Sequence, residues 1–164
     1  MESRNQYDVE FRDALGLFPT GVTVVTTLDR HGNRVGITAN SFSSVSLDPM
    51  LVSWSISRVS RHFATFIEAE YFAIHVLNAR QKALSRQFSA DLHDRFKGID
   101  TIEGWGGIPL LTDYCSRFEC ATEHRYQGGD HVILVGLVID YQIKFSSPLV
   151  FHCGNYKELP GLPA

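Results

Sequence analysis

Three short segments of the sequence carry the side chains best suited to binding or chemistry. The first, Thr38-Ala39-Asn40-Ser41-Phe42, directly follows a predicted strand. Its small and hydroxyl-bearing residues would allow a flat ligand to approach the backbone and its N–H donors. The edge of a flavin ring needs such donors and acceptors, and its faces need apolar contact. A turn between two strands has the same composition, so the segment alone leaves both interpretations open.

The second segment combines hydroxyl groups with a cation. Ser53, Ser55 and Ser57 alternate along a predicted strand, which places their side chains on one face. Ser60 and Arg61 then open a predicted helix, with Ser60 as its N-cap. Hydroxyl groups, a guanidinium and free helix N–H groups at one place would suit a phosphate. A polar strand face followed by an ordinary N-cap explains the same residues without a ligand.

The third segment is Gly129-Asp130-His131, at a tight turn before a predicted strand. The imidazole of His131 could donate a hydrogen bond to a carboxamide or shuttle a proton, because free histidine titrates near pH ~6.5. A solvent-exposed hairpin tip has the same composition. The turn by itself therefore does not distinguish a ligand contact from a simple hairpin.

Other kinds of site have weaker support. Cys115, Cys120 and Cys153 are odd in number and form no C-x-x-C pair, so we expect small buried apolar residues and not disulfides. The histidines form no set with metal-ligand spacing, and no metal site is predicted. The sequence carries neither the glycine-rich signatures of Rossmann and P-loop nucleotide sites nor a G-x-S-x-G nucleophile elbow.

Length and composition fit one globular domain over residues 1–164. Apolar residues make up 44% of the chain and charged residues 20%, which are ordinary values for a protein with a sizeable core. The net charge of -3 and the scattered Lys and Arg give no basic footprint for nucleic acid. No apolar run approaches the ~20 residues of a membrane helix, and the polar N-terminus lacks a secretory h-region. We therefore expect a cytoplasmic protein without membrane or nucleic-acid partners.

Strands dominate the pattern along the chain. Alternating and β-branched residues predict strands at 21–28, 35–38, 42–47, 50–57, 71–77, 115–126, 131–144 and 149–153. Apolar residues at helical spacing predict helices at 9–18, 60–69 and 78–88, and residues 89–109 are predicted as a long loop. Because the helices are isolated inserts between strands, the predicted fold class is mainly β, a barrel with peripheral helices.

In order along the chain, these segments resemble the short-chain flavin reductase family, the FMN-binding split-barrel proteins. The resemblance begins with an opening motif at Phe18 to Thr26 and a central loop at Gly36 to Pro49. It continues through Phe88-Ser89, Asp94-Arg95-Phe96, Gly129-Asp130-His131 with Gly136, and Phe151 to Tyr156. The similar segments extend from Phe11 to Leu159, which is nearly the whole chain.

The resemblance implies a six-stranded antiparallel Greek-key split β-barrel and a homodimer, with FMN or FAD near the subunit interface. It implies a NAD(P)H:flavin oxidoreductase that supplies reduced flavin to a partner monooxygenase, with NADH or NADPH as co-substrate. The implied flavin contacts are Thr38, Ala39, Asn40 and Ser41 at the ring and ribityl chain, Ser55, Ser57, Ser60 and Arg61 at the phosphate, and Phe88 and Ser89 beside them. His131, with Asp130 positioning the turn, would lie by the nicotinamide, and Tyr156 would border the same pocket.

In such a reaction the hydride passes from the nicotinamide to flavin N5, and the cofactors supply the chemistry. His131 is therefore predicted to position the nicotinamide and not to be an obligatory acid. His62 stands where many family members carry Thr, which leaves the choice between FMN and FAD open. The alternatives are a tight FMN-binding electron-transfer flavoprotein, a non-enzymatic flavin- or haem-binding split barrel, and a β-barrel without a cofactor.

Overall fold

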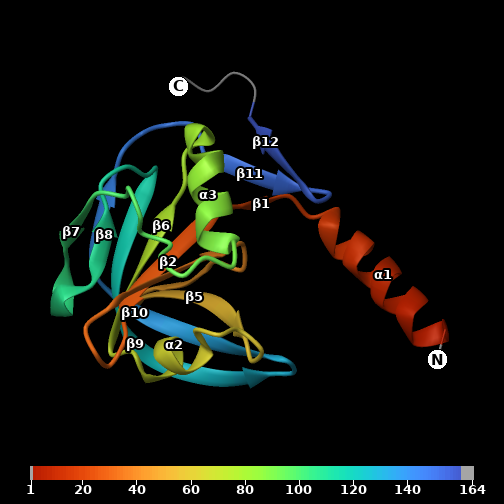
Figure 1. Ribbon diagram of the computed structural model, residues 1–164, viewed down its shortest axis with the longest axis horizontal. Coiled ribbons are helices and arrows are strands. Elements are labelled where there is room, and N and C mark those ends of the chain that lie inside the picture. Colours follow the sequence, from red (N-terminus) through yellow and green to blue (C-terminus); the bar gives the residue numbers. More distant parts are fainter. Residues whose placement is uncertain (1, 160–164) are drawn as a thin grey trace.

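The computed structural model describes residues 2–159, with side chains from Tyr7 onward. Its main sheet has seven strands in the order β3-β2-β6-β9-β10-β5-β4, and every pairing is antiparallel. They are β2 Thr23–Leu28, β3 Arg34–Ala39, β4 Ser43–Leu47, β5 Met50–Ser57, β6 Tyr71–Val76, β9 Ser116–Gly128 and β10 His131–Ile143. The sheet curls into a barrel, as Figure 1 shows. The mainly β, antiparallel architecture is therefore as predicted.

Smaller elements surround the barrel. A second sheet joins β1 Thr20–Gly21, β11 Leu149–His152 and β12 Asn155–Glu158, and a two-stranded sheet joins β7 Thr101–Glu103 and β8 Pro109–Leu111. The helices are α1 Glu2–Gly16, α2 Phe63–Glu68 and α3 Lys82–Ser89, with 3-10 turns η1 Ala79–Gln81 and η2 Trp105–Gly107. In Figure 1, α3 lies against one side of the barrel, α2 lies at its lower end, and α1 extends away from it.

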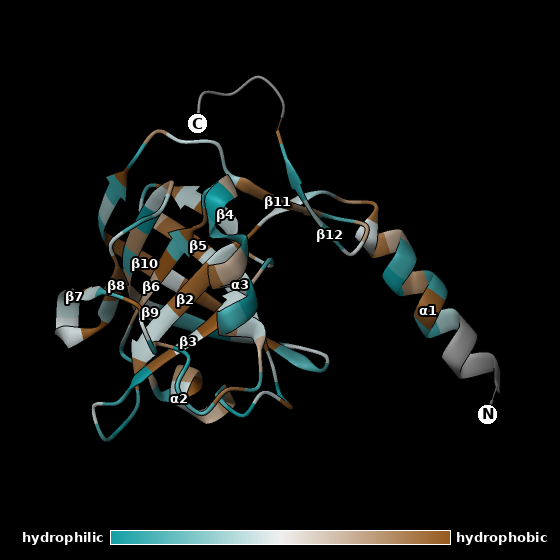
Figure 2. Cartoon of the chain, turned by 45° about the horizontal axis from the view of Figure 1, so that its top comes forward, coloured by the Kyte–Doolittle hydropathy of each residue, from teal (hydrophilic) through white to brown (hydrophobic). Residues whose placement is uncertain are grey.

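Alternation along the strands separates two apolar cores. On β2, Val25 belongs to the core inside the barrel, whereas its neighbour Val24 belongs to a second core beneath α3. Successive strand residues point to opposite faces, so one apolar run serves both cores. On β5, Val52, Trp54 and Ile56 are buried and the serines between them are only partly so. The predicted serine face of β5 therefore lies outside the barrel core, and hydrophobic colouring follows the barrel strands in Figure 2.

Aromatic packing closes the barrel next to α2. Trp54, Phe66 and Phe72 are fully buried. The Trp54 ring meets Phe66 of α2 edge-on, with 4.9 Å between ring centroids. Edge-to-face pairs of this kind add about 0.5–1.5 kcal/mol beyond their buried area. This contact fixes α2, and with it the chain from Ser57 to His62 that connects α2 to β5.

The strand count differs from the prediction. Seven strands form the main sheet where six were expected, because β3 and β4 both extend along its two edges. The predicted loop at 89–109 contains β7 and η2, and the chain after residue 153 contains β12, which the sequence pattern did not indicate. These are short elements, and a run of three or four residues is too brief for alternation to show.

Two local predictions about helix starts have opposite outcomes. Asn78 caps η1 as predicted: its side chain accepts from the Arg80 N–H, and Gln81 reciprocates in a capping box. Ser60 is not the N-cap of α2, because the helix starts only at Phe63 after a tight turn. Ser60 Oγ instead accepts from the His62 N–H at 3.3 Å.

The cysteine prediction is correct for Cys120 and wrong for Cys153. Cys120 is buried, and burial raises the pKa of its thiol to about 12. Cys115 is half-buried. Cys153 is exposed because it lies at the tip of the β11–β12 hairpin, with a left-handed φ of 48°.

Helix α1 carries apolar side chains that nothing in the described chain covers. Phe11, Leu15 and Phe18 are the apolar residues at helical spacing in the helix predicted at 9–18, and all three are exposed. The helix itself starts earlier and ends at Gly16.

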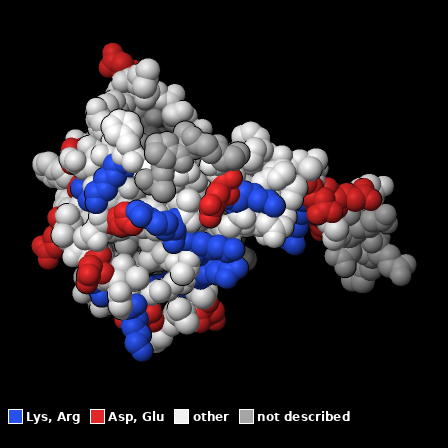
Figure 3. Space-filling model, turned by 90° about the horizontal axis from the view of Figure 1, so that it is seen from above, with Lys and Arg blue, Asp and Glu red and all other residues white. Residues whose placement is uncertain are grey.

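Charges of both signs are distributed over the surface. The face seen in Figure 3 has basic side chains near its centre and acidic ones around them. Among residues 2–159, no helix is long and apolar enough to cross a membrane.

Candidate functional site

One cavity of about 350 Å³ collects residues from four separate parts of the chain. Its volume falls within the ~300–1,000 Å³ of typical small-molecule sites. The walls come from the end of β3 and the loop after it, the end of β5 and the turn after it, the end of α3 with the following loop, and the start of β10. The lining residues are Ile37, Thr38, Ala39, Asn40, Ser41, Ser55, Ile56, Ser57, Ser60, Phe88, Ser89, Arg95 and His131.

The first wall is an edge strand. β3 pairs with β2 on one side only within the described chain. An edge strand leaves every second backbone N–H and C=O without a strand partner, so these groups can serve a ligand. Thr38 Oγ1 is already engaged, because it donates to the Ser85 carbonyl of α3 at 2.6 Å. This wall therefore offers backbone groups in a strand held in place by α3.

The second wall is tied to the first by one serine. Ser41 Oγ accepts from the Ser55 N–H at 2.9 Å and lies 3.3 Å from the Ser55 carbonyl. Ser41 thus joins the loop after β3 to the middle of β5. Further along β5, Ser57 is the direct partner of His131 in β10. The β5 serines and His131 consequently occupy one continuous edge of the cavity.

His131 stands at the rim of the cavity on a braced hairpin. Its Nδ1 lies 2.7 Å from Asp130 Oδ1, and this hydrogen bond holds the pKa of the exposed Asp130 carboxyl below its usual value. The Arg58 N–H donates to the Asp130 carbonyl at 2.9 Å, and its guanidinium contacts Gly129 and Gln127. Arg58 therefore fixes the tip that carries His131, a role that the sequence analysis did not assign to it.

The third wall is the end of α3. The Phe88 ring is fully buried and meets Phe96 edge-on, with 4.9 Å between ring centroids. Ser89 Oγ donates to the Arg86 carbonyl at 3.0 Å. As along β3, the hydroxyl group is bonded within the protein.

Arg95 is a cationic lining residue that was not predicted as a site residue. Its Nε donates to the Ala90 carbonyl at 2.9 Å and its Nη1 to the Gly36 carbonyl at 3.0 Å. Burial, followed by the nearby Arg61 guanidinium, lowers the pKa of Arg95, and Asp91 opposes this. The motif Asp94-Arg95-Phe96 carried the only sequence signal for it.

Arg61 lies behind the turn and outside the lining. Its guanidinium forms an ion pair with Asp91, donates to the Leu92 carbonyl, and donates through Nε to His62 Nε2 at 3.0 Å. Burial and the charges of Arg95 and Arg61 lower the pKa of His62 to about 4. His62 is therefore neutral at pH 7, between the cations of Arg61 and Arg95.

Tyr156 lines an adjoining hollow of about 290 Å³. The two hollows share Thr38, Ala39, Asn40 and Ser89. The Tyr156 hydroxyl lies 2.8 Å from Ser85 Oγ. Tyr156 thus lies on the other side of residues 38–40 from the β5 serines, and not inside the same cavity.

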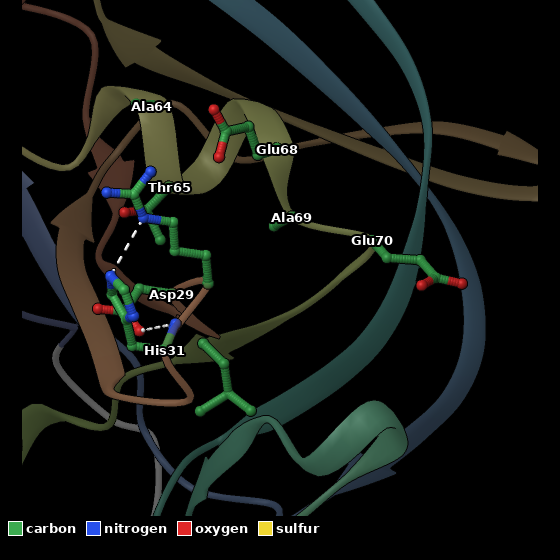
Figure 4. A pocket seen from close by; sticks show the side chains of 9 residues that line it. Asp29, His31, Ala64, Thr65, Glu68, Ala69 and Glu70 are labelled. Carbon is green, nitrogen blue, oxygen red and sulfur yellow. Dashed lines mark hydrogen bonds between the residues drawn. The ribbon is translucent and has the colours of Figure 1, made fainter.

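A larger hollow of about 650 Å³ lies between the β2–β3 turn and α2, shown in Figure 4. Asp29 and His31 form its turn side, with 2.8 Å between the His31 N–H and Asp29 Oδ1. Glu68 and Glu70 add further negative charge on the opposite side. It contains no residue predicted for flavin binding.

The structure thus brings most of the predicted residues together. The main cavity contains Thr38, Ala39, Asn40, Ser41, Ser55, Ser57, Ser60, Phe88, Ser89 and His131. Arg61, Asp130 and Tyr156 lie near it but outside its lining. Among residues 2–159, no group of three or more His, Cys, Asp or Glu side chains is placed to hold a metal ion.

Comparison with known families shows which family this chain belongs to. The profile described as Flavin reductase like domain matches residues 15–160. The chain belongs to this family.

Relatives of this flavin reductase-like domain carry consistent names. It is 40% identical over 145 residues to the reductase subunit of stachydrine N-demethylase from Rhizobium meliloti, covering 88% of this chain and 63% of that protein. It is 43% identical over 146 residues to the NADH-dependent FMN reductase SmoA of Agrobacterium fabrum, covering 89% and 83%. The chain therefore spans less than two thirds of the length of the first of these relatives.

A solved structure agrees with the fold. The NADH:FAD oxidoreductase SgcE6 of Streptomyces globisporus, determined with NAD and FAD fragments, is 35% identical and superposes with a TM-score of 0.89. The superposition covers 94% of this flavin reductase-like domain and 93% of that chain.

The cavity of the flavin reductase-like domain has the donor set a flavin requires. Unpaired backbone groups of an edge strand line one side, as the ring edge needs. Ser57, Ser60 and Arg95 add hydroxyl groups and a cation to the lining, as a phosphate needs. The residues present therefore fit this group.

Proposed function

We propose that this protein is a NAD(P)H:flavin oxidoreductase that supplies reduced flavin to a separate monooxygenase. The proposal rests on one observation above all: residues from β3, β5, α3 and β10, far apart in sequence, line a single cavity. Family membership and the names of the relatives support it. Those names do not favour a tight FMN-binding electron carrier, and we do not pursue that alternative.

In this proposal the cavity walls hold the flavin. The backbone of Thr38, Ala39, Asn40 and Ser41 would contact the ring and ribityl chain, with Phe88 and Ser89 beside them. Ser55, Ser57 and Ser60 would receive the phosphorylated end. Arg95 would supply the cation nearest the cavity, and Arg61 would act from behind it through Asp91 and His62.

The bound flavin would supply the chemistry by accepting hydride at N5 from a reduced nicotinamide. The protein's part is to hold two rings at the near-attack distance of about 3–3.5 Å. His131 suits the carboxamide of the nicotinamide because it stands at the rim with its Nδ1 held by Asp130. That hydrogen bond leaves Nε2 to face a ligand. We expect the reaction to take place in the cytoplasm, where nicotinamide nucleotides are reduced.

Delivery to an oxygenase requires that reduced flavin leave the site. A cavity lined mainly by main chain and small side chains gives few side-chain contacts to break on release. One relative is named as the reductase subunit of stachydrine N-demethylase. The partner of the present chain would be a separate oxygenase component that takes up free reduced flavin.

We further propose that the protein is a homodimer. Phe11, Leu15 and Phe18 expose 66%, 58% and 74% of their surfaces on and just after α1. A second copy of the chain would cover these side chains. Light scattering at micromolar concentration would report twice the 18.4 kDa chain mass, and a monomer there would refute the dimer.

Steady-state NADH oxidation tests the activity. Added FMN or FAD should start NADH consumption, and the rate should saturate with flavin as it would for a substrate. A rate independent of added flavin, in protein that retains bound pigment, would identify a resident prosthetic group. Flavin fluorescence unchanged by the protein would refute the proposed function altogether.

A further inference from the structure

The tip of the β9–β10 hairpin extends beyond the strand that supports the rest of it. β10 pairs with β5 only as far as His131, which lies opposite Ser57, the last residue of β5. Gly129 and Asp130, which form the turn, therefore have no strand partner on the β5 side. Exposed loop tips are among the most mobile parts of a domain. The side chains on this tip keep a fixed orientation only if another contact holds the turn.

Arg58, the residue directly after β5, supplies that contact. Its backbone N–H donates to the Asp130 carbonyl at 2.9 Å, and its Nε donates to the Gly129 carbonyl at 3.2 Å. Its Nη2 donates to Gln127 Oε1. The guanidinium carbon lies 5.8 Å from the centroid of the Phe63 ring, at the start of α2. Arg58 therefore ties the hairpin tip to the beginning of α2.

The tip also determines which nitrogen of His131 carries the proton. His131 Nδ1 lies 2.7 Å from Asp130 Oδ1. This hydrogen bond is the main reason that the pKa of the Asp130 carboxyl is below its usual value, so the carboxylate is ionised at neutral pH and can only accept. Nδ1 is therefore the donor, and in the neutral imidazole Nε2 has a lone pair and no proton.

This acceptor stands at the rim of the flavin cavity. His131 lines the cavity, and 43% of its side chain is exposed. Within the part of the chain that the structure describes, no group bonds to His131 Nε2. A nicotinamide carboxamide has a carbonyl oxygen and an –NH2 group, and only the –NH2 group can donate to an acceptor. The direction of the hydrogen bond therefore depends on the contact between Asp130 and Nδ1.

We propose that Arg58 is a positioning residue for the nicotinamide, because it holds the tip so that His131 Nε2 accepts from the carboxamide –NH2 group. The inference rests on the proposed function, since it requires a reduced nicotinamide at the rim. It goes beyond that function in two respects. It gives a role to Arg58, which lies outside the cavity lining, and it makes the amide N–H of the co-substrate a determinant of specificity.

Steady-state kinetics of Arg58→Ala provide the first test. The variant loses the side-chain bonds to Gly129 and Gln127, so His131 spends less time in the binding orientation. We expect the KM for NADH to rise about three- to five-fold, with kcat changed by less than about two-fold and flavin affinity unchanged. Arg58→Lys should restore part of the loss, because one ammonium group does not reproduce the fork of the guanidinium. An unchanged KM in Arg58→Ala would overturn the inference.

Arg30→Ala is the matched control. Arg30 is also exposed, and its Nε donates to His31 Nε2 at 3.1 Å in the β2–β3 turn. It lines the acidic hollow of Figure 4 and not the flavin cavity. The control removes the same charge as Arg58→Ala and should leave the KM for NADH unchanged. An equal rise in both variants would indicate a general effect of net charge and contradict a specific role for Arg58.

A double-mutant cycle separates action through His131 from direct contact with the nucleotide. If Arg58 acts only through His131, Arg58→Ala should not raise the KM for NADH any further in a His131→Ala background. A further rise of about three-fold in that background would show that Arg58 contacts the nucleotide itself. The positioning role would then be wrong.

An analogue of the co-substrate tests the direction of the hydrogen bond. The reduced 3-acetylpyridine analogue of NADH keeps the carbonyl group but has a methyl group in place of –NH2. Arg58→Ala and His131→Ala should leave its KM within about two-fold of the wild-type value while they raise the KM for NADH. An equal rise for both co-substrates would show that the imidazole donates to the carbonyl and would overturn the inference but not the proposed function. A wild-type protein that fails to oxidise NADH in the presence of flavin would overturn both.

Discussion

The cavity wall and the hairpin tip at its rim are built in opposite ways. In the wall, the hydroxyl groups of Thr38, Ser41 and Ser89 are already bonded within the protein, which leaves the main chain to face a ligand. At the tip, His131 and Asp130 present side chains that are 43% and 92% exposed. In the wall, side chains fix the position of the backbone. At the tip, a backbone turn positions the His131 side chain.

This difference indicates a division of labour. A wall of fixed main chain costs little reorganisation when a ligand binds, because its groups are already in place. An exposed side chain can adjust to a second ligand that arrives later. Changes in the wall should therefore affect stability and flavin binding together, whereas changes at the tip should affect only the nicotinamide.

The largest effect is expected from Gly36→Ala in the wall. A Cβ at this position would lie 2.5 Å from Phe88 Cε1 and 3.1 Å from Phe96 Cζ, inside a packed core. Overpacking of this kind costs about 1–3 kcal/mol of unfolding free energy, and we expect flavin affinity to fall with it. Urea unfolding measures the first effect and flavin fluorescence the second. Gly21→Ala, with nothing within 4 Å, is the control and should leave both unchanged.

Arg95→Ala should have the next largest effect. It removes the donors to the Ala90 and Gly36 carbonyls and the cation of the cavity. We expect a loss of about 1–2 kcal/mol in stability and weaker binding of FMN. Riboflavin, which lacks the phosphate, should lose less affinity than FMN. Equal losses for the two ligands would show that Arg95 supports the fold and does not contact the phosphate.

His62 should make the region behind the wall sensitive to acid. Its pKa is lowered from 6.5 to about 4, chiefly by burial, so the unfolded state binds a proton more readily than the folded state between these values. Stability should therefore fall as pH decreases from about 6.5 to about 4. His62→Gln should reduce this loss by about 1 kcal/mol at pH 5, a figure that allows for partial exposure. Urea unfolding midpoints of variant and wild type at pH 7 and pH 5 measure this difference. If both proteins lose the same stability between these pH values, His62 is not the cause of the acid sensitivity.

The smallest effect on stability, and the most selective effect on function, is expected at the tip. His131→Ala should raise the KM for NADH roughly three- to ten-fold and lower kcat by less than about two-fold. Unfolding midpoints and flavin affinity should remain at wild-type values. A variant with an ordinary KM and a greatly reduced kcat would make His131 an obligatory proton donor instead.

The sequence predicted the long elements well because their signals are periodic. β5 alternates through Val52, Trp54 and Ile56, and β9 and β10 are long runs joined by a glycine turn. It missed β12, which is four residues long, and the late start of α2, where Ser60 turns back on His62. Such features depend on tertiary contacts that local composition does not encode.

The candidate site could be predicted in part. Hydroxyl-rich strand ends indicated which segments belong to the site. They did not indicate that the hydroxyl groups of Thr38 and Ser41 would form hydrogen bonds within the protein. The roles of Arg58 and Arg95 were not predicted. Each side chain donates a hydrogen bond to a backbone carbonyl in a distant segment, Arg58 to Gly129 and Arg95 to Gly36. A side chain that bonds to main chain leaves no pattern in the sequence that identifies its partner.

The central prediction is that a flavin occupies the cavity between β3, β5, α3 and β10. Titration of isotope-labelled protein with FMN, followed by backbone amide resonances, tests this claim directly. We predict that the amides of residues 38–41, 55–57, 60, 89 and 131 shift together and saturate with the fluorescence titration. Shifts confined to the acidic hollow around Asp29, Glu68 and Glu70, or no saturable shifts at all, would contradict it.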